Sequence, residues 1–188
     1  MTILLIISVL TIILVILLVK MYNTLIEKKN QVTNIFSSVN VLLKKRYNLI
    51  PNLVSLVSRY MTHEKEILQK ITELRTQFNK PGITDDQKVT LDHEISATLG
   101  KIMVAVENYP NLKANENFLH LQHTLTEVEA QISAARRAYN LAVTNYNNAI
   151  EMVPTNFMAM IMGYTHKKVF GIKETETQNI NIKELFNR

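Results

Sequence analysis

The hydrophobic pattern divides the chain into one uninterrupted apolar stretch and a long region of helical periodicity. Residues 1–19 carry no charged side chain, and between Ile3 and Val19 only Ser8 and Thr11 interrupt the Ile, Leu and Val residues. Because a helix rises about 1.5 Å per residue, this stretch is just long enough to cross a hydrocarbon core of roughly 30 Å. We therefore predict a transmembrane anchor at 1–20, which includes Ile3, Leu10, Leu14, Leu17 and Val19.

A cleaved signal peptide is the alternative interpretation of this stretch. No Lys or Arg precedes the apolar run, and the run is longer than the roughly 7–15 residues typical of a signal peptide. No small-x-small cleavage site follows it. Lys20, Lys28 and Lys29 come after the span, whereas no basic side chain precedes it. The positive-inside rule then places the bulk of the chain in the cytoplasm, with a short N-terminus outside.

Beyond the anchor, apolar residues recur at spacings of three and four, which predicts long amphipathic helices. Turn signals divide them into four, at 20–46, 51–79, 85–108 and 115–152, with Thr84 and Asn115 as N-caps. The last helix has a regular apolar seam, typical of coiled-coil packing. We predict an all-α fold: a single transmembrane helix, an antiparallel bundle of long helices at 21–164 (a four-helix bundle favoured), and a partly ordered tail at 165–188.

Pro51 leaves two interpretations of the first cytoplasmic stretch. The heptad phase of Phe36, Leu43, Ile50 and Val57 runs straight through it, which suggests one long kinked helix. A chain reversal at 47–50 would instead make four helices of comparable length and place Pro51 in a first helical turn. We favour the reversal, because a kink would leave the membrane-proximal stripe bare unless other subunits covered it.

Composition excludes several classes of function. The chain has no Cys, so it has no disulfide, thiolate zinc site or cysteine nucleophile. The net charge of +5 lies in small scattered clusters rather than in the basic stripe that a nucleic-acid interface needs. Anionic lipid headgroups would attract such clusters mildly, but we favour the simpler explanation that they are solvated helix faces. The partner we expect is the lipid bilayer that the anchor crosses, and we expect no nucleic acid.

Candidate chemistry is sparse. His120 and His123 form an i, i+3 pair without further convergent ligands, and no phosphate loop or nucleophile elbow is present. We expect no enzymatic activity, cofactor, metal or small-molecule substrate. Three polar side chains form a candidate network, Arg46, Glu129 and Arg136. We expect such a network to fix the register of the helices. The Tyr-Asn repeats at 139–140 and 146–147 are expected to place their rings at the edge of the seam.

The segment 157–164 has no polar side chain until its last residue. One interpretation, which we favour, is a short helix that caps the bundle core. The other is an adaptable Met-rich contact surface for a membrane or a partner. Four alternating helical passes would return the segment to the bilayer, and three would leave it at the far tip. The residues of this candidate surface are Phe157, Met158, Met160, Ile161, Met162 and Tyr164.

Several motifs, in order along the chain, resemble the LemA family. They are RYNLIPNLV at 46–54, HEKE at 63–66, YPNLKANENF at 109–118, ARRAYN at 135–140 and YN at 146–147. The resemblance implies a bacterial membrane protein with an N-terminal transmembrane helix and a mostly antiparallel helical bundle. It implies no agreed activity, although one branch is associated with intracellular membrane compartments. Asn40 stands where the family usually has the Asp of a buried Asp–Arg pair, and Val153 where it usually has Phe.

The sequence thus predicts a bacterial inner-membrane protein that acts by binding. Our first hypothesis is a membrane-anchored helical scaffold, with a protein partner or a second copy of itself as its target. The alternative is a membrane-organising or remodelling protein that self-assembles on lipid. A third hypothesis is a ligand- or metal-binding sensor built on the bundle.

Overall fold

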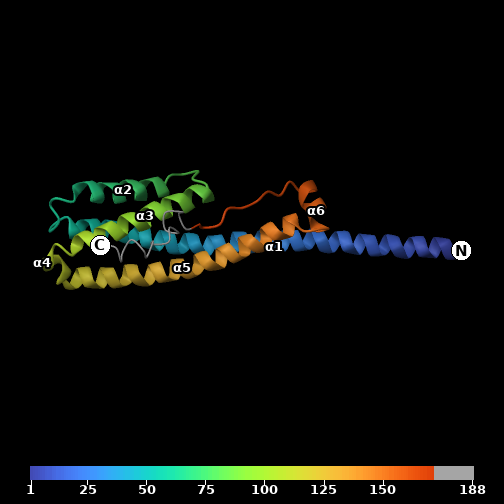
Figure 1. Cartoon of the computed structure of the whole chain (residues 1–188), viewed down its shortest axis with the longest axis horizontal. Helices are drawn as coiled ribbons and strands as arrows, with labels where there is room; N and C mark the ends of the chain where they lie inside the picture. The colour runs from blue at the N-terminus through green and yellow to red at the C-terminus, as the bar shows by residue number, and fades with distance from the viewer. Residues whose placement is uncertain (172–188) are drawn as a thin grey trace, which may run out of the picture.

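The computed structural model describes residues 1–171, and this part of the chain is helical without strands (Figure 1). The predicted tail is therefore described only at 165–171, and its remaining residues lie outside the described range. Residues 165–171 form no helix and run back along the bundle. The elements are α1 Thr2–Val57, α2 Lys65–Phe78, α3 Asp85–Val106, α4 Pro110–Lys113, α5 Glu116–Glu151 and α6 Thr155–Ile161.

The N-terminal part of α1 extends beyond the rest of the molecule (Figure 1). Every residue from 1 to 20 is exposed, and Leu25 is the first buried residue of the helix. This stretch is long and apolar enough to cross a membrane, and no part of it is covered by protein. The predicted membrane-spanning residues all lie on this bare stretch, Ile3, Leu10, Leu14, Leu17 and Val19. The prediction of an all-α fold with one transmembrane helix is confirmed.

The helices behind the span alternate in direction. In Figure 1, α1 runs away from the N-terminus, α2 returns, α3 runs outward again and α5 returns toward the span. The most extensive packing is between α1 and α5. The buried stripe of α1 from Leu25 to Val57 is about 50 Å long and the 36-residue α5 about 54 Å, so α5 covers the whole stripe. α2 and α3 lie only along the half of α1 far from the span (Figure 1).

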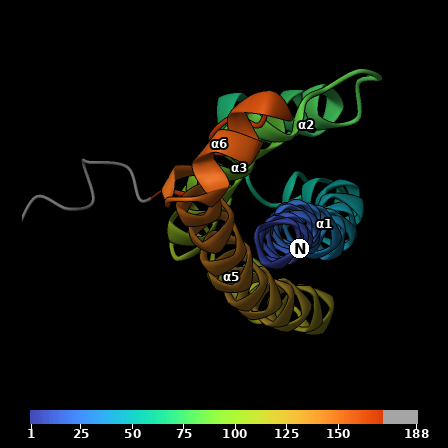
Figure 2. The same ribbon diagram turned by 90° about the vertical axis from the view of Figure 1, so that its right-hand side faces the viewer.

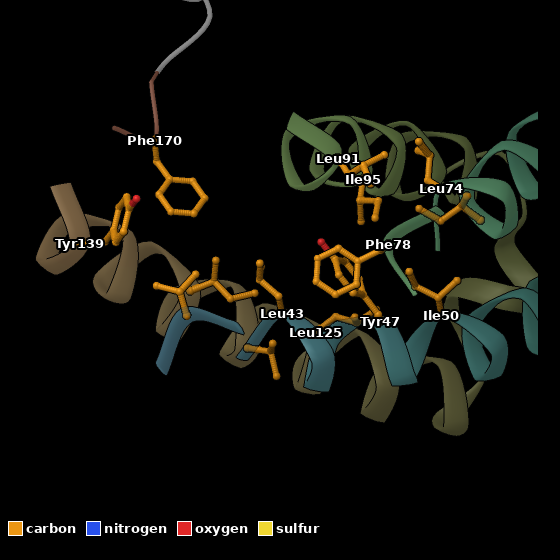
Figure 3. Close-up of a cluster of buried hydrophobic side chains, with 14 of the residues drawn as sticks. Leu43, Tyr47, Ile50, Leu74, Phe78, Leu91, Ile95, Leu125, Tyr139 and Phe170 are labelled. Carbon is orange, nitrogen blue, oxygen red and sulfur yellow. The ribbon is translucent and has the colours of Figure 1, made fainter. Parts of the chain in front are cut away.

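The expected chain reversal at 47–50 is wrong. α1 continues through Pro51, and Tyr47, Ile50 and Leu53 are all buried in one continuous stripe (Figure 3). The membrane-proximal stripe is not left bare, because α5 reaches back along it and α6 packs against α1. The reversal occurs instead at residues 58–64, between α1 and α2. That segment contains no Gly or Pro, so it lacks a strong turn signal.

A side chain from α2 explains how α1 tolerates Pro51. Proline has no backbone N–H, so the carbonyl of Tyr47, four residues earlier, loses its partner within the helix. Arg75 of α2 donates its Nε–H to this carbonyl oxygen at 3.2 Å. The bond within the helix is thus replaced by one between α1 and α2. Pro51 therefore marks a contact between two helices rather than the end of one.

The predicted caps of α3 and α5 are confirmed. The Thr84 hydroxyl accepts a hydrogen bond from the Gln87 backbone N–H, and the Thr84 backbone N–H donates in return to the Gln87 side-chain oxygen, which forms a capping box. Asn115 caps α5 by accepting from the Phe118 backbone N–H at 3.1 Å. Both helices therefore begin where the sequence places them.

Candidate functional site

A buried ion network joins three helices in the middle of the bundle. Arg46 of α1 and Arg136 of α5 each donate to one carboxylate oxygen of Asp92 on α3. Arg46 and Asp92 have no solvent exposure at all. A buried charge is tolerated only when it is paired and hydrogen-bonded, and here both Asp92 oxygens are occupied. The network therefore ties α1, α3 and α5 together at one level.

Two further groups complete the surroundings of Arg46. Its Nη1 donates to Glu129 of α5 at 2.5 Å and to the Ser96 hydroxyl of α3 at 2.9 Å. Burial alone would lower the pKa of Arg46, but the negative charges of Asp92 and Glu129 more than offset this and raise it. The guanidinium therefore stays charged, and its role is electrostatic and structural.

The sequence pattern indicated three members of this network but not Asp92, the carboxylate at its centre. Arg46, Glu129 and Arg136 lie together, and a carboxylate on α3 lies between the two arginines. A signal was present: Asp92 falls in the apolar stripe of α3, three residues before Ile95 and in step with Ile102. A carboxylate in a buried stripe requires a cation opposite, and the basic residue in the stripe of α1 is Arg46.

Beside this network lies a groove between α3 and α5, with a volume of about 570 Å³. The charged side chains at its wall, Arg46 and Glu129, are already paired with each other. The groove therefore offers a mainly apolar surface with one satisfied ion cluster at its edge. Its other lining residues include Leu99, Met103, Leu125, Thr126 and Ala130.

The two Tyr-Asn repeats of α5 bind the extended segment that follows α6. Asn147 donates to the carbonyl of Lys167 and accepts from its N–H, both at 3.0 Å. Asn140 makes the same pair of bonds with Phe170, at 2.9 and 2.8 Å. Seven helical residues rise about 10.5 Å, and three extended residues span about 10 Å, so the two spacings match. The two asparagine side chains thus bind backbone groups of the segment, so these bonds do not depend on which side chains it carries.

The tyrosine of each repeat anchors the same segment. Tyr146 donates its hydroxyl to the Thr165 carbonyl at 3.1 Å, and burial and the nearby Tyr164 raise its pKa. Tyr139 lies edge-on to Phe170, with ring centroids 5.1 Å apart (Figure 3), and also contacts Phe36 of α1. The rings therefore lie at the edge of the α1–α5 seam, as the sequence predicted.

The segment 157–164 both packs on the bundle and leaves a face bare. Ala159 is buried, and three of its neighbours pack partly against the core, Met158, Met162 and Tyr164. The opposite side of α6 is exposed at Phe157, Met160 and Ile161. One side of this segment therefore packs on the bundle core, and its other side is the exposed apolar face that the contact-surface hypothesis concerns.

α6 has a defined end and position. The N–H of Tyr164 bonds to the Ala159 carbonyl and that of Gly163 to the Met160 carbonyl, which is a Schellman motif. Gly163 has φ of +65°, the left-handed conformation this motif requires. Beyond it, the Lys29 ammonium of α1 lies over the Tyr164 ring, 5.2 Å from its centroid. α6 is thereby held against the part of α1 that leaves the span.

The histidine pair considered from the sequence does not form a metal centre within residues 1–171. His123 pairs with Glu127 at 3.7 Å, with both side chains largely exposed. No group of three or more potential metal ligands comes together in the described part of the chain.

These features define a single-span membrane protein whose anchor continues, as the same helix, into an antiparallel helical bundle held by a buried ion network. The chain belongs to the LemA family, whose profile it matches over residues 35–183. It is 27% identical over 165 residues to Protein LemA of Metamycoplasma hominis, across 88% of this chain and 75% of that one. It is also 28% identical over 190 residues to magnetosome protein MamQ 2 of Paramagnetospirillum magneticum, across 88% and 70% of the two chains. MamQ of Magnetospirillum gryphiswaldense is 24% identical over 175 residues, across 80% and 64%.

Proposed function

We propose that this membrane-associated LemA-family protein is a scaffold that acts by binding rather than by catalysis. The observation that carries the proposal is the unbroken α1 helix, which extends from the apolar span to the far end of the bundle. A bundle built on the same helix as its anchor presents its surface in a fixed geometry relative to the span. That geometry suits a protein that positions partners beside a membrane.

The state of the buried charges supports binding over catalysis. A general base or nucleophile needs a reactive group with access to substrate. Asp92 is fully buried, and its two oxygens are taken by Arg46 and Arg136. Glu129 is the most accessible member of the network, but it too is paired with Arg46. The cluster is built to hold helices in register.

The bundle is proposed to lie on the cytoplasmic side of the inner membrane. Lys20, Lys28 and Lys29 flank the span on the bundle side. The positive-inside rule counts such flanking residues.

Photocrosslinking in the native membrane tests the scaffold. A photoreactive amino acid would replace Val104 on α3 or Leu141 on α5, which are 73% and 64% exposed. The matched control is Ile95, which is fully buried and should crosslink only within the chain. Discrete heterologous products from the exposed positions support the scaffold. Large products that contain only this chain would contradict it.

Self-assembly on lipid is the second candidate function. Two of the relatives reported above are named magnetosome proteins, and the uncovered apolar face of α6 would allow lateral contact at the membrane. The crosslinking experiment separates this candidate from the first, because it expects ladders of the chain with itself. The third candidate, a ligand sensor, would use the groove beside Arg46 and would give neither product.

A further inference from the structure

The outer face of α6 is an apolar surface that the bundle does not cover. Phe157, Met160 and Ile161 follow the i, i+3, i+4 pattern of one helical face and are 62%, 78% and 82% exposed. Met152 and Val153, in the preceding turn, are 63% and 74% exposed. A helix that faces water normally presents polar residues on that side. Adjoining exposed apolar residues of this kind mark an interaction site.

This surface lies at the end of the bundle that is closest to the span. Figure 1 shows α6 nearer to the N-terminus than any other folded element apart from α1. In Figure 2, which looks along α1 from its N-terminal end, α6 is in front of the bundle. The four alternating passes of α1, α2, α3 and α5 bring it there, which is the arrangement that returns the segment to the bilayer.

The folded bundle begins close to the end of the span. α6 packs against α1, and the adjoining Tyr164 contacts Lys29. Leu25, the first buried residue of α1, follows the end of the apolar run at Val19 by six residues, or about 9 Å of helix. The polar region on each side of the hydrocarbon core is about 5–8 Å thick. The bundle therefore begins near the outer edge of this polar region, and α6, with its exposed apolar side chains, lies at the same end of the bundle (Figure 1).

The charges around the surface favour lipid over a protein partner. Residues 152–164 contain no charged side chain, Lys29 of α1 lies over the Tyr164 ring, and Lys167 and Lys168 follow shortly after it in the sequence. Glu151, which precedes the segment, is paired with His166. An apolar face bordered by lysines is the pattern of helices that rest at an anionic membrane surface. A partner protein would have to compete with the bilayer for a face at this height.

We propose that the outer face of α6, with Met152 and Val153, inserts into the headgroup–acyl boundary of the bilayer that α1 crosses. α6 is then a second membrane contact, and the bundle stands on two points rather than one. The inference deepens the proposed function by naming the surface on which the scaffold rests. This membrane contact of α6 depends on the α1 anchor and requires no protein partner.

Tryptophan fluorescence tests the proposal, because the chain has no Trp of its own. The full chain carrying Met160→Trp or Ile161→Trp would be reconstituted into vesicles of phosphatidylcholine and phosphatidylglycerol, with or without brominated acyl chains. Tyr22→Trp, next to the span, is the positive control, and Val104→Trp, exposed on α3, is the matched negative control. Bromolipid should quench the α6 reporters about twofold or more, since an interfacial helix lies roughly 5–10 Å deep.

Each outcome decides the proposal. Quenching at 160 and 161 close to that at 22, with none at 104, supports it. Quenching at 160 and 161 no greater than at 104 overturns it. So does a blue-shifted emission that bromolipid leaves unchanged and that disappears as protein is diluted in lipid, because a second copy would then cover the face. In a further variant, Phe157→Trp with Met160→Asp and Ile161→Asp, the quenching should be lost while helicity is kept.

The test can fail without the scaffold failing. Crosslinks from Val104 on α3 and Leu141 on α5 report partners of the bundle surface and do not require α6 to touch lipid. Loss of quenching with crosslinks retained overturns only the α6 contact. Quenching with no heterologous crosslink overturns only the scaffold.

Discussion

At the scale of single residues, the central feature is a carboxylate placed in an apolar stripe. Asp92 has no exposed surface and is held by two arginines from different helices. An apolar residue of similar size could also be buried at this position, but Arg46 would then lose the carboxylate that it is paired with. The ion network therefore selects one register of α1, α3 and α5, which purely apolar seams select less sharply.

Replacing Asp92 with Ala should destabilise the bundle by about 3–5 kcal/mol, because it leaves buried positive charge poorly compensated. The measurement is chemical unfolding of the full chain in detergent, followed by circular dichroism. Glu129→Gln is the matched control, since the Glu129 side chain is 43% exposed and Gln keeps an acceptor for Arg46. Its cost should be about 1 kcal/mol or less. Equal costs for the two variants would contradict the central role of Asp92.

Tyr47 predicts a loss of stability at alkaline pH. Burial and the neighbouring Asp92 raise its pKa above the ordinary value of 10.0. The unfolded chain therefore ionises first, so the stabilisation is complete below about pH 10 and is lost as pH rises toward the higher pKa of the folded state. The loss can reach about 1.4 kcal/mol per pH unit for one tyrosine. Tyr47→Phe should reduce this slope in unfolding titrations between pH 8 and about pH 11. An unchanged slope would exclude Tyr47 as its source.

A site residue can be found from the sequence when it is a charged side chain within the apolar stripe of its helix. Arg46 could be found because a cation interrupts the apolar row of α1. Asp92 carries the same conflict on α3, but the choice of partner needs the fold. The pairing of Asn140 with Phe170 could not be foreseen, because asparagine beside a seam is ordinary and its target is a backbone without side-chain identity.

At the scale of elements, α1 shows how a neighbouring helix determines what a proline does. The pattern of Phe36, Leu43, Ile50 and Val57 favoured a continuous helix, and the local preference at Pro51 favoured a break. Arg75 decides in favour of the pattern, because it satisfies the Tyr47 carbonyl that Pro51 leaves open. Local preference is weak beside burial of a whole stripe. The reversal falls at 58–64 instead, in a segment that lacks Gly and Pro.

A double-mutant cycle tests this account of Pro51. Arg75→Met keeps most of the aliphatic side chain and removes the donor, so it should cost about 1.5–3 kcal/mol, the range for a hydrogen bond from a charged group. In a Pro51→Ala background, the new alanine supplies a backbone N–H to the Tyr47 carbonyl, and the same Arg75 change should cost at least about 1 kcal/mol less, by the value of one hydrogen bond. The free energies of unfolding of the four chains give the coupling. Strictly additive costs would show that Arg75 does not compensate for Pro51.

The Tyr-Asn ladder of α5 is tested by hydrogen exchange. Asn147→Ala removes two hydrogen bonds to Lys167, each worth about 0.5–1.5 kcal/mol, so the Lys167 amide should exchange roughly 5- to 100-fold faster. Asn140→Ala should act in the same way on Phe170. Asn148→Ala changes an exposed neighbour on the same helix and is the matched control. Equal exchange in all three variants would mean that the ladder does not hold the segment.

At the scale of the whole molecule, the fold class and the anchor followed from the sequence, and the relation between them did not. Hydropathy identifies a span and periodicity identifies helices, but neither shows that both belong to one helix. The return of α6 to the span depends on the number of passes that precede it. Shifting the first reversal from 47–50 to 58–64 keeps four passes, so the segment 157–164 arrives near the bilayer with the reversal at either place.

Cysteine labelling tests the side of the membrane on which the bundle lies, because the chain has no Cys. Ser37 is exposed on α1 in the bundle, and Thr2 lies at the opposite end of the span. In spheroplasts, a membrane-impermeant maleimide should label Thr2→Cys. It should leave Ser37→Cys unlabelled until the membrane is permeabilised. The reverse pattern would place the bundle outside and overturn the orientation.

Because α1 passes from lipid into the bundle without a joint, the bundle inherits the tilt of the span. Helices adjust their tilt to the thickness of the surrounding bilayer. Over roughly 50 Å of rigid helix, a change of tilt of about 10° moves the far tip by about 9 Å. A change in bilayer thickness would thus displace the far end of the bundle sideways, parallel to the membrane.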